Sequence, residues 1–449
     1  MSSQAARHPL WAMFQYYAGN LRLSFLLLAC IVLGGTSQYI YTFKLPLYLI
    51  SLLFIGGILA SNNRRDLSKL ITLPNLLISS FAALFILYCL PVWPSLWSGL
   101  AGRNLSVEGF TLLQEPLPWL PLSLHPEKTF LSIFDFLPIL AVMMVTGLTK
   151  NNTELLWALY ALLVIVFISF LFGLFQMVLG PEGNRLYAIY NPGRPLGFFS
   201  NTNHFACLCA MVLPVAFYLA LKNIGSSSQS GSYAVQRFLG GMMIIAFSTA
   251  IILSGSGAGY LMLLIAFIVS PLIIINNKRV VKRMRILILC GIVLLVADFV
   301  FFSGQFWKVA DNFTSDISTS RSEIFKTITG FRKDYGLFGI GPGAFEHIYK
   351  IYESQSPIST SFVNQAHNDY VQLWLEFGVF GALAVIIGMV GFVRLAYKQI
   401  VSRERYTIIY LLAAFMPIFH SSVDYPFRTI AISATFVFIL SLISRKVSF

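Results

Sequence analysis

Long runs of apolar residues recur along the whole chain and are separated by short polar stretches. Runs such as LLVIVFISFLFGLF are continuously apolar and do not alternate with a period of two. They therefore predict membrane helices rather than the strands of an outer-membrane barrel. About twelve segments approach the roughly 20 apolar residues that a helix needs to cross a bilayer core. These are residues 22–41, 45–60, 74–92, 128–148, 154–180, 204–222, 238–253, 257–276, 286–303, 370–393, 406–422 and 428–444.

The composition excludes a chain built of water-soluble domains. Hydrophobic residues make up 57% of the 449 residues, and charged residues only 11%. Soluble proteins carry about 25% charged residues. The N-terminal 21 residues lack a small-residue cleavage site after a short apolar run, so we expect the first membrane segment to be retained as an anchor. The fold class predicted is all-α, as a polytopic protein with about twelve transmembrane helices.

The net charge of +13 could indicate nucleic acid, an anionic membrane surface or an anionic substrate. With both termini inside the cell, the predicted inner connections hold 19 of the 31 lysines and arginines, as the positive-inside rule requires. Few acidic residues fall on that side. The basic excess is therefore expected to serve topology and contact with membrane lipids, and nucleic acid is not expected as a partner.

Three long connections face the outer side in this topology. They are rich in aromatic and apolar residues, which argues against disorder, and loops longer than about 15 residues are usually functional. We expect them to form a cap of short helices on one membrane domain that spans residues 1–449. The three connections are residues 93–126, 181–203 and 304–369.

The largest connection contains a helix signal and a glycine-rich strip. Ser320 and Glu323 form a capping box, which predicts an amphipathic surface helix near 321–331 with Arg321 in its first turn. The strip GLFGIGPGAF, residues 336–345, lacks the Lys-Ser/Thr pair of a phosphate-binding loop. It favours a tight turn in which the backbone approaches a neighbour closely.

His367 is the leading candidate for chemistry. Asn368 and Asp369 are good N-cap residues, so His367 is expected at the outer mouth of a helix. The positive end of that helix attracts phosphate, and Asn368 is a candidate substrate-binding residue. A single histidine at a membrane interface is more often structural than catalytic, and the neighbouring candidates favour the catalytic interpretation.

Arginines in the outer connections are candidates for binding an anion. Arg185, Arg194 and Arg321 could each hold a lipid headgroup, or they could clamp a diphosphate through paired hydrogen bonds. Asp424 lies in the last outer turn and could either orient a histidine or pair with Arg428.

Some acidic residues fall well inside predicted membrane segments. Asp135, Asp298 and Glu376 lie there at a depth where ionisable groups are costly and usually functional. Each could equally be the structural partner of an outer arginine.

No metal or cofactor is expected. The five cysteines fall within predicted segments, and Cys207 and Cys209 lack the second pair that a zinc site needs. No D-x-D-type acidic pair is present, so a Mg-dependent enzyme that uses a nucleotide sugar has little support. Arginines can neutralise a diphosphate leaving group without a metal.

These residues favour either a transferase that acts on a lipid-linked anionic donor or a transporter of an anionic solute. Transporters usually place charged residues near the bilayer midplane between repeats. Here the polar residues gather at one face of the membrane, which favours chemistry at the surface.

Four stretches resemble the O-antigen ligase and O-antigen polymerase superfamily. They are GRPLGFFSNTNHFA, the Arg321 segment that leads to GIGPGAF, QAHNDYVQLWLEFGVFG and HSSVDYPFR, in this order between about residues 185 and 428. The third stretch looks like the family signature, in which a His-Asn pair leads into a helix with a Glu-x-Gly.

The resemblance implies a GT-C-type glycosyltransferase of the bacterial inner membrane, with its active site facing the periplasm. Such enzymes transfer a glycan from undecaprenyl diphosphate, and in the ligases the acceptor is a sugar hydroxyl of lipid A-core. His367 matches the family's essential histidine, and Arg194 and Arg321 match its essential arginines. Asp424 matches an acidic position, whereas no motif secures Arg185.

Two roles for His367 and several reactions stay open. His367 could accept the proton of the attacking hydroxyl, or it could bind phosphate as imidazolium. A repeat-unit polymerase shares the donor and motifs of a ligase. A protein O-oligosaccharyltransferase usually has a further C-terminal region, and the sequence given ends at Phe449, shortly after its last predicted segment. An anionic-solute transporter is the option from another class.

Overall fold

The computed structural model describes most of the chain, and the predicted segment 286–303 lies outside the described part. The described residues are 9–38, 41–61, 68–70, 73–180, 186–187, 193–222, 231–275, 282, 315–353 and 363–448. Arg185 and Asp298 also lie outside them. Within the described ranges the all-α prediction is confirmed, because the two strands are only two residues each: β1 (Pro91–Val92) pairs antiparallel with β2 (Leu120–Pro121).

The long helices are those of a multi-pass membrane protein. Within the described residues, seven helical spans are long and apolar enough to cross a bilayer, and four more apolar helices are shorter. The long elements are α1 (Pro9–Leu33), α2 (Tyr41–Ser61), α4 (Leu73–Cys89), α7 (Pro126–Phe134), α8 (Phe136–Leu148), α9 (Asn152–Leu179), α10 (Thr202–Leu221), α11 (Gly231–Ser254), α12 (Gly257–Ile274), α18 (Val379–Ser402), α19 (Arg405–His420) and α20 (Ile430–Ser444).

Helix α10 lies in the interior of the bundle, whereas α18 lies on its surface. In the apolar stretch of α10, 83% of the residues are buried inside the protein, and the helix packs against α11, α12 and α19. In the apolar stretch of α18, only 6% of the residues are buried. A helix that is apolar all round and enclosed by protein is a core helix, and one with exposed apolar residues faces lipid. The residues at the start of α10 are therefore held inside the protein.

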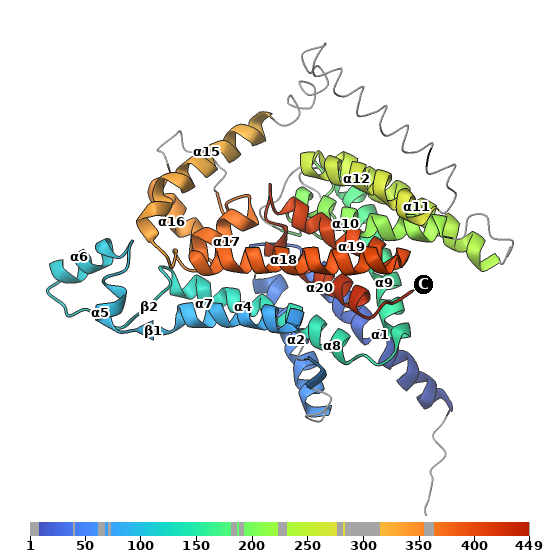
Figure 1. Cartoon of the computed structure of the whole chain (residues 1–449), viewed down its shortest axis with the longest axis horizontal. Helices are drawn as coiled ribbons and strands as arrows, with labels where there is room; N and C mark the ends of the chain where they lie inside the picture. The colour runs from blue at the N-terminus through green and yellow to red at the C-terminus, as the bar shows by residue number, and fades with distance from the viewer. Residues whose placement is uncertain are drawn as a thin grey trace, which may run out of the picture.

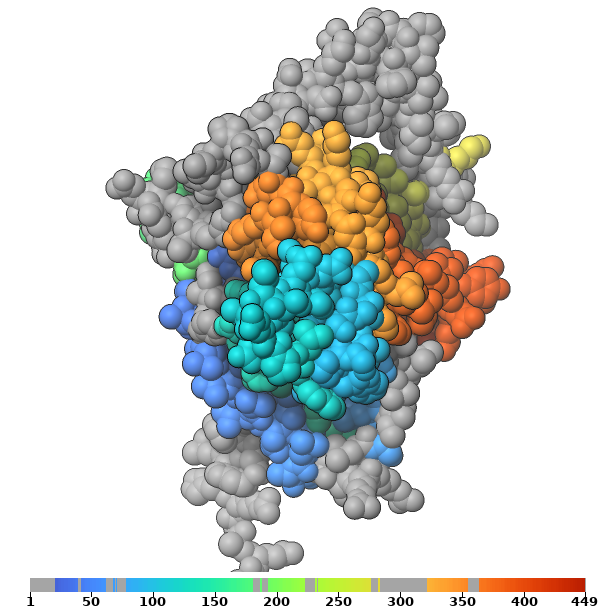
Figure 2. Space-filling model, turned by 90° about the vertical axis from the view of Figure 1, so that its left-hand side faces the viewer, coloured from blue at the N-terminus to red at the C-terminus, as the bar shows by residue number. Residues whose placement is uncertain are grey.

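Short helices form a cap at one end of the bundle (left in Figure 1). They are α5 (Pro94–Trp97), α6 (Asn104–Leu112), α15 (Ser315–Phe331), η2 (Arg332–Tyr335), α16 (Phe345–Tyr352) and α17 (Asp369–Phe377). Figure 2 faces this end and shows α5 and α6 beneath α15, α16 and α17. A buried cluster that includes Ile328, Phe331, Phe345 and Leu375 joins α15, α16 and α17. Apolar contacts of this kind give the cap a core of its own.

Helix α15 begins earlier than the sequence predicts. It starts at Ser315 and ends at Phe331. Arg321 therefore lies after the first turn, so the expected position of Arg321 beside the free N–H groups of a helix start is wrong. The chain continues as a helix through Ser320 because a capping box is only a local signal and packing decides where a helix begins.

The predicted membrane segment 370–393 is two helices, which is a second correction. Gly378 has φ = 58° and separates α17 from α18, and Figure 1 shows the two at an angle. A Cβ atom at Gly378 would collide with the carbonyl of Leu337, so this break requires glycine. The membrane span is therefore α18, which continues to Ser402 and includes Arg394 and Lys398, two residues that the sequence assigns to a connection.

The glycine-rich strip makes the predicted close approach. Gly339 and Gly341 have φ = 72° and 96°, and the strip passes the C-terminal end of α17. The N–H of Ile340 donates to the carbonyl of Leu375 at 3.1 Å, and the N–H of Gly341 to that of Glu376 at 2.9 Å. The strip thus satisfies carbonyls that a helix end leaves without partners, and it is a structural turn.

Asp135 is paired at membrane depth. Nζ of Lys44, a residue of α2 that is only 1% exposed, lies 3.0 Å from both carboxylate oxygens of Asp135. The hydroxyl of Tyr48 donates to the same carboxylate at 2.5 Å. Of the two interpretations that the sequence left open for Asp135, this contact supports the structural one, although the partner is a lysine of α2 and not an outer arginine.

Candidate functional site

The carboxylate of Asp424 is the centre of a buried polar cluster beneath the cap. Asp424 is fully buried, in the turn that follows α19. Its side chain accepts a hydrogen bond from Nδ2 of Asn203 at 2.8 Å. Four cationic or titratable nitrogens face the same two oxygens, from His367 at 3.3 Å, Arg321 at 3.5 Å, His420 at 3.8 Å and His204 at 3.9 Å.

Four elements bring these residues together. Helix α10 begins at Thr202 with Asn201 as its cap, which accepts from the N–H of Asn203 at 2.9 Å, so Asn203 and His204 lie in its first turn. The end of α19 supplies His420, and the N–H of Asp424 donates to the His420 carbonyl at 3.0 Å. Arg321 comes from α15 and His367 from the residue before the cap of α17.

His367 is held in an unusual backbone conformation. Its φ is 50°, in the left-handed region that residues other than glycine rarely adopt. The hydrogen bonds of the next residue, Asn368, hold this backbone conformation in place. Asn368 caps α17 by accepting from the N–H groups of Tyr370 and Val371, each at 3.0 Å, and its amide donates to the carbonyl of Ser422 at 2.7 Å. Strain of this kind persists only where its surroundings determine it, and it is frequent at functional sites.

Aromatic packing completes the position of His367. The ring of Tyr425 lies edge-on to His367 with centroids 4.9 Å apart, and edge-on to His204 at 4.8 Å. The N–H of Asp369 donates to the carbonyls of Ser421 and Asp424 at 3.0 and 3.2 Å, which joins α17 to the turn after α19. Hydrogen bonds of the neighbouring backbone and the ring contact with Tyr425 therefore both hold the imidazole of His367 beside Asp424.

Asp424 is held in its ionised form. Burial raises the pKa of this carboxyl, but His367, His204 and His420 oppose burial, and the net pKa lies well below its usual range. A buried carboxylate is stable only with such partners.

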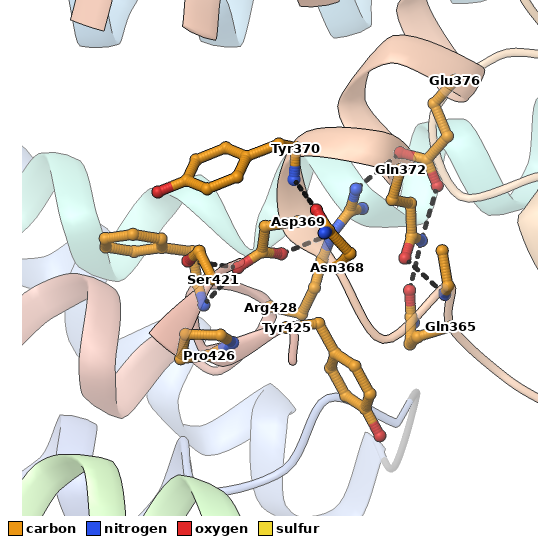
Figure 3. A network of polar contacts seen from close by, with 12 residues as sticks. Gln365, Asn368, Asp369, Tyr370, Gln372, Glu376, Ser421, Tyr425, Pro426 and Arg428 are labelled. Carbon is orange, nitrogen blue, oxygen red and sulfur yellow. Dashed lines mark hydrogen bonds and ion pairs between the residues drawn. The ribbon is translucent and has the colours of Figure 1, made fainter. Parts of the chain in front are cut away.

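A second network lies beside the first and contains Arg428 (Figure 3). Nη2 of Arg428 lies 2.8 Å from Glu376, and its Nε lies 3.7 Å from Asp369, both in α17. The predicted alternative in which Arg428 pairs with Asp424 is therefore wrong, because Arg428 pairs with Asp369 and Glu376 of α17. Glu376, predicted as either functional or structural, is fully buried and serves as the partner of an outer arginine.

Asp369 has a raised pKa. It accepts hydrogen bonds from the hydroxyl of Ser421 at 2.9 Å and the N–H of Phe427 at 3.2 Å. Burial raises the pKa of Asp369 to about 7, against the opposing effects of Arg428 and these two hydrogen bonds. The carboxyl therefore changes its charge near neutral pH, next to the turn that holds Asp424.

The other predicted site residues are more scattered. Nη1 of Arg194 donates to the carbonyl of Ser254 at 3.2 Å, beside Gly255 at the turn between α11 and α12. The Thr202 hydroxyl donates to the carbonyl of Pro195 at 3.0 Å, which ties the Arg194 segment to the start of α10. The described contacts thus bring His367 and Arg321 together at Asp424. Asn368 lies beside them as a helix cap. Arg194 instead contacts the carbonyl of Ser254.

The sequence interpretation missed His204 and His420 as members of the site. Both are fully buried, and neither ring has a hydrogen-bond partner among the described residues. A signal was present: His420 precedes Asp424 by four residues, and His204 lies within the Asn-rich start of α10. Among the described residues, no group of three or more His, Cys, Asp or Glu side chains has the arrangement of a metal site.

The geometry allows two chemical operations. The side chain of His367 is 26% exposed and has one ring nitrogen toward a buried carboxylate, so its other nitrogen can exchange a proton with a ligand. The side chain of Arg321 is 30% exposed at the same carboxylate and can bind an anion.

A comparison with protein families gives a match to part of the chain. Residues 242–386 match the family described as O-antigen ligase. This segment contains Arg321, His367 and Asn368, whereas Arg194 and Asp424 lie outside it. No curated protein matches the chain.

Proposed function

Because residues 242–386 match the O-antigen ligase family and the described helices are those of a multi-pass membrane protein, we propose that this protein is an O-antigen ligase. It transfers a glycan from undecaprenyl diphosphate to a sugar hydroxyl of lipid A-core, at the periplasmic face of the bacterial inner membrane. The observation that carries this proposal is the buried Asp424 carboxylate, with His367 at 3.3 Å and Arg321 at 3.5 Å.

His367 is the general base. The acceptor hydroxyl attacks the anomeric carbon, and His367 takes the proton that this oxygen releases. Asp424 faces the other ring nitrogen, so it orients the imidazole and stabilises the imidazolium that forms. The left-handed backbone at His367 supports this role, since it fixes the ring before substrate binds.

Arg321 stabilises the leaving group. The bond between the anomeric carbon and the phosphate oxygen breaks, and the diphosphate departs with the bonding electrons. Its developing negative charge is balanced by a guanidinium, which requires no metal. Arg194 and Arg185 remain proposed donor contacts, and Arg194 would have to leave or share the Ser254 carbonyl to take part. In-line attack inverts the anomeric carbon.

The cap faces the periplasm in this proposal, and both termini face the cytoplasm. The support is the bias of lysine and arginine toward the predicted inner connections. The cluster around Asp424 then lies where a lipid-linked donor and a lipid acceptor in the outer leaflet can both reach it.

Transfer by the purified protein tests the proposal. A radiolabelled glycan on undecaprenyl diphosphate is incubated with lipid A-core and the detergent-solubilised protein. Label on lipid A-core is the expected result. Label that grows only on the donor lipid would instead identify a repeat-unit polymerase, and label on an acceptor protein would identify a protein O-oligosaccharyltransferase. Solute uptake into proteoliposomes without any transfer would identify a transporter.

A further inference from the structure

A large cleft lies along α18 and is separate from the cluster around Asp424. Its volume is about 1520 Å³, more than the roughly 300–1,000 Å³ of pockets for drug-sized ligands. Its walls are mainly apolar side chains of α4, α8, α18 and α20, such as Phe85, Met143, Leu383 and Phe436. Leu383 is 47% exposed, so part of this wall is open to its surroundings. An apolar cleft of this size among membrane helices fits hydrocarbon chains.

The cap end of the cleft is polar. Its lining there includes His125, Lys128, His347 and Lys350, where the rings of His125 and His347 meet edge-on at 5.1 Å. Lys350 is paired with Glu346 at 2.6 Å. Burial lowers the pKa of His125, and the nearby His347 and Lys128 lower it further. Nδ1 of His125 accepts from the N–H of Lys128 at 3.4 Å, so a neutral His125 can donate through Nε2 to the oxygen of a hydroxyl-bearing ligand.

Two side chains, Asn364 and Tyr425, link the lining of the cleft to the proposed base. Asn364 lines the cleft, and its Oδ1 accepts from the hydroxyl of Tyr425 at 3.5 Å. The ring of Tyr425 contacts His367. Arg321 and Arg194 are not among the described residues that line the cleft. The described lining of the cleft thus does not include the arginines proposed to contact the diphosphate.

We propose that this cleft binds the acceptor glycolipid, an inference that rests on the proposed function. The acyl part lies against α18 and α20, and the sugar lies at the cap end with a hydroxyl directed past Asn364 toward His367. The charges at the cap end favour the acceptor over the donor. Three cationic side chains and three carboxyl groups line the cleft at this end: Lys128, Lys350 and Arg428, with Glu346, Asp369 and Glu376. Cationic groups are therefore not in surplus there, whereas a diphosphate needs such a surplus.

Filling the cleft tests the apolar part. Gly388 and Gly391 of α18 line the cleft, and a Cβ atom at either would meet no atom within 4 Å. Gly388→Leu and Gly391→Leu should raise the KM for lipid A-core by about tenfold, which corresponds to ~1.4 kcal/mol, and leave the KM for the donor unchanged. Val390→Leu is the matched control, because Val390 is exposed on the same helix outside the cleft.

Removing polar groups tests the cap end. His125→Phe and His347→Phe should each raise the KM for lipid A-core and leave the kcat near its original value. If the KM for the donor rises instead, the cleft binds the donor. If neither KM changes in the glycine or histidine variants, the cleft holds only bulk lipid, and the proposal is wrong.

A binding measurement separates this inference from the proposed function. Lipid A-core that carries a photoreactive acyl group should crosslink to α18 or α20 of the original protein, and less to Gly388→Leu. Crosslinking without any transfer would overturn the ligase function and leave the binding site in place. Transfer with crosslinks that are unchanged in Gly388→Leu would leave the function in place and overturn the binding site.

Discussion

Nδ1 of His367 lies 3.3 Å from Oδ1 of Asp424, and the carboxylate is fully buried while the imidazole is partly exposed. His367 precedes α17, and Asp424 follows α19. The pair therefore lies where two chain segments meet, and each residue is fixed by its own helix end. In this arrangement, Nδ1 of the histidine faces the carboxylate of Asp424, and Nε2 remains for contact with a ligand.

Asp424→Asn should lower the kcat of glycan transfer by roughly 10²–10⁴-fold, because the amide neither orients His367 nor balances its positive charge in the transition state. The KM for the donor should change less. Asp334→Asn is the matched control, since Asp334 is an exposed carboxylate of the cap. An Asp424→Asn enzyme with normal kcat would show that the carboxylate has no part in the reaction.

His367→Gln should also lower the kcat by roughly 10²–10⁴-fold, with binding of the donor lipid retained, because a base acts after the donor is bound. Binding is measured with the labelled donor on purified protein. If the variant binds the donor poorly but transfers the glycan from bound donor at nearly the original rate, the alternative in which His367 contacts phosphate as imidazolium is favoured. Thermal unfolding of the variant checks that the fold survives.

Arg321→Lys should raise the KM for the donor and lower the kcat, since lysine cannot make two parallel hydrogen bonds to phosphate. We expect a combined loss of about tenfold or more in kcat/KM. Arg194→Lys tests whether the arginine at the Ser254 turn takes part. Arg403→Lys, at an exposed position, provides the control. Normal kcat/KM in Arg321→Lys would exclude paired recognition of the diphosphate.

Glu376→Gln should destabilise the protein by about 3–5 kcal/mol, because it leaves the guanidinium of Arg428 without one carboxylate in a buried network. Glu346→Gln breaks an exposed pair with Lys350 and should cost only about 0–1 kcal/mol. Thermal unfolding in the same detergent compares the two variants. Equal shifts in the two would mean that the Arg428 network adds nothing beyond a surface pair.

Stability should depend on pH through Asp369. Its pKa is raised from 3.8 to about 7 by burial, so between these values the folded protein binds a proton that the unfolded chain does not. The free energy of unfolding therefore falls as the pH rises across this interval and levels off above it. Asp369→Asn should remove this component, and thermal midpoints measured from pH ~5 to ~8 would reveal the difference. Parallel curves for the two proteins would contradict the raised pKa.

The sequence predicted the positions of the described apolar helices because each is specified by its own run of apolar residues. Seven spans among the described residues are long and apolar enough to cross a bilayer, so the count of about twelve stays a prediction. Its errors are at helix ends. The break at Gly378 was missed because glycine is common in membrane helices, and only the carbonyl of Leu337 in another segment makes that glycine necessary. The start of α15 was misplaced for a similar reason, since a local capping signal does not outweigh packing.

The site was only partly predictable. His367 and Asn368 could be found because a helix cap after a polar run is a local pattern, and the structure places Asn368 as that cap. The partner of Asp424 could not be chosen, since Arg428 and several histidines were all possible. The pairing depends on how α10, α17 and α19 converge, and residues far apart in the chain carry no local signal of their contact.

The pair formed by Lys44 and Asp135 has a consequence for how the chain enters the bilayer. Each residue lies within a membrane-spanning segment, Lys44 near the start of Thr42–Ser61 and Asp135 deeper inside Pro126–Leu148. A single lysine or aspartate costs up to about 2.5–3.5 kcal/mol on insertion, with the largest cost at the centre of a helix. The ion pair between Lys44 and Asp135 offsets this insertion free energy only when α2 and the α7–α8 segment are both present in the membrane. Because α4 lies between them in the chain, α2 is expected to be inserted before its partner is available, and the ion pair forms only once the α7–α8 segment has joined it.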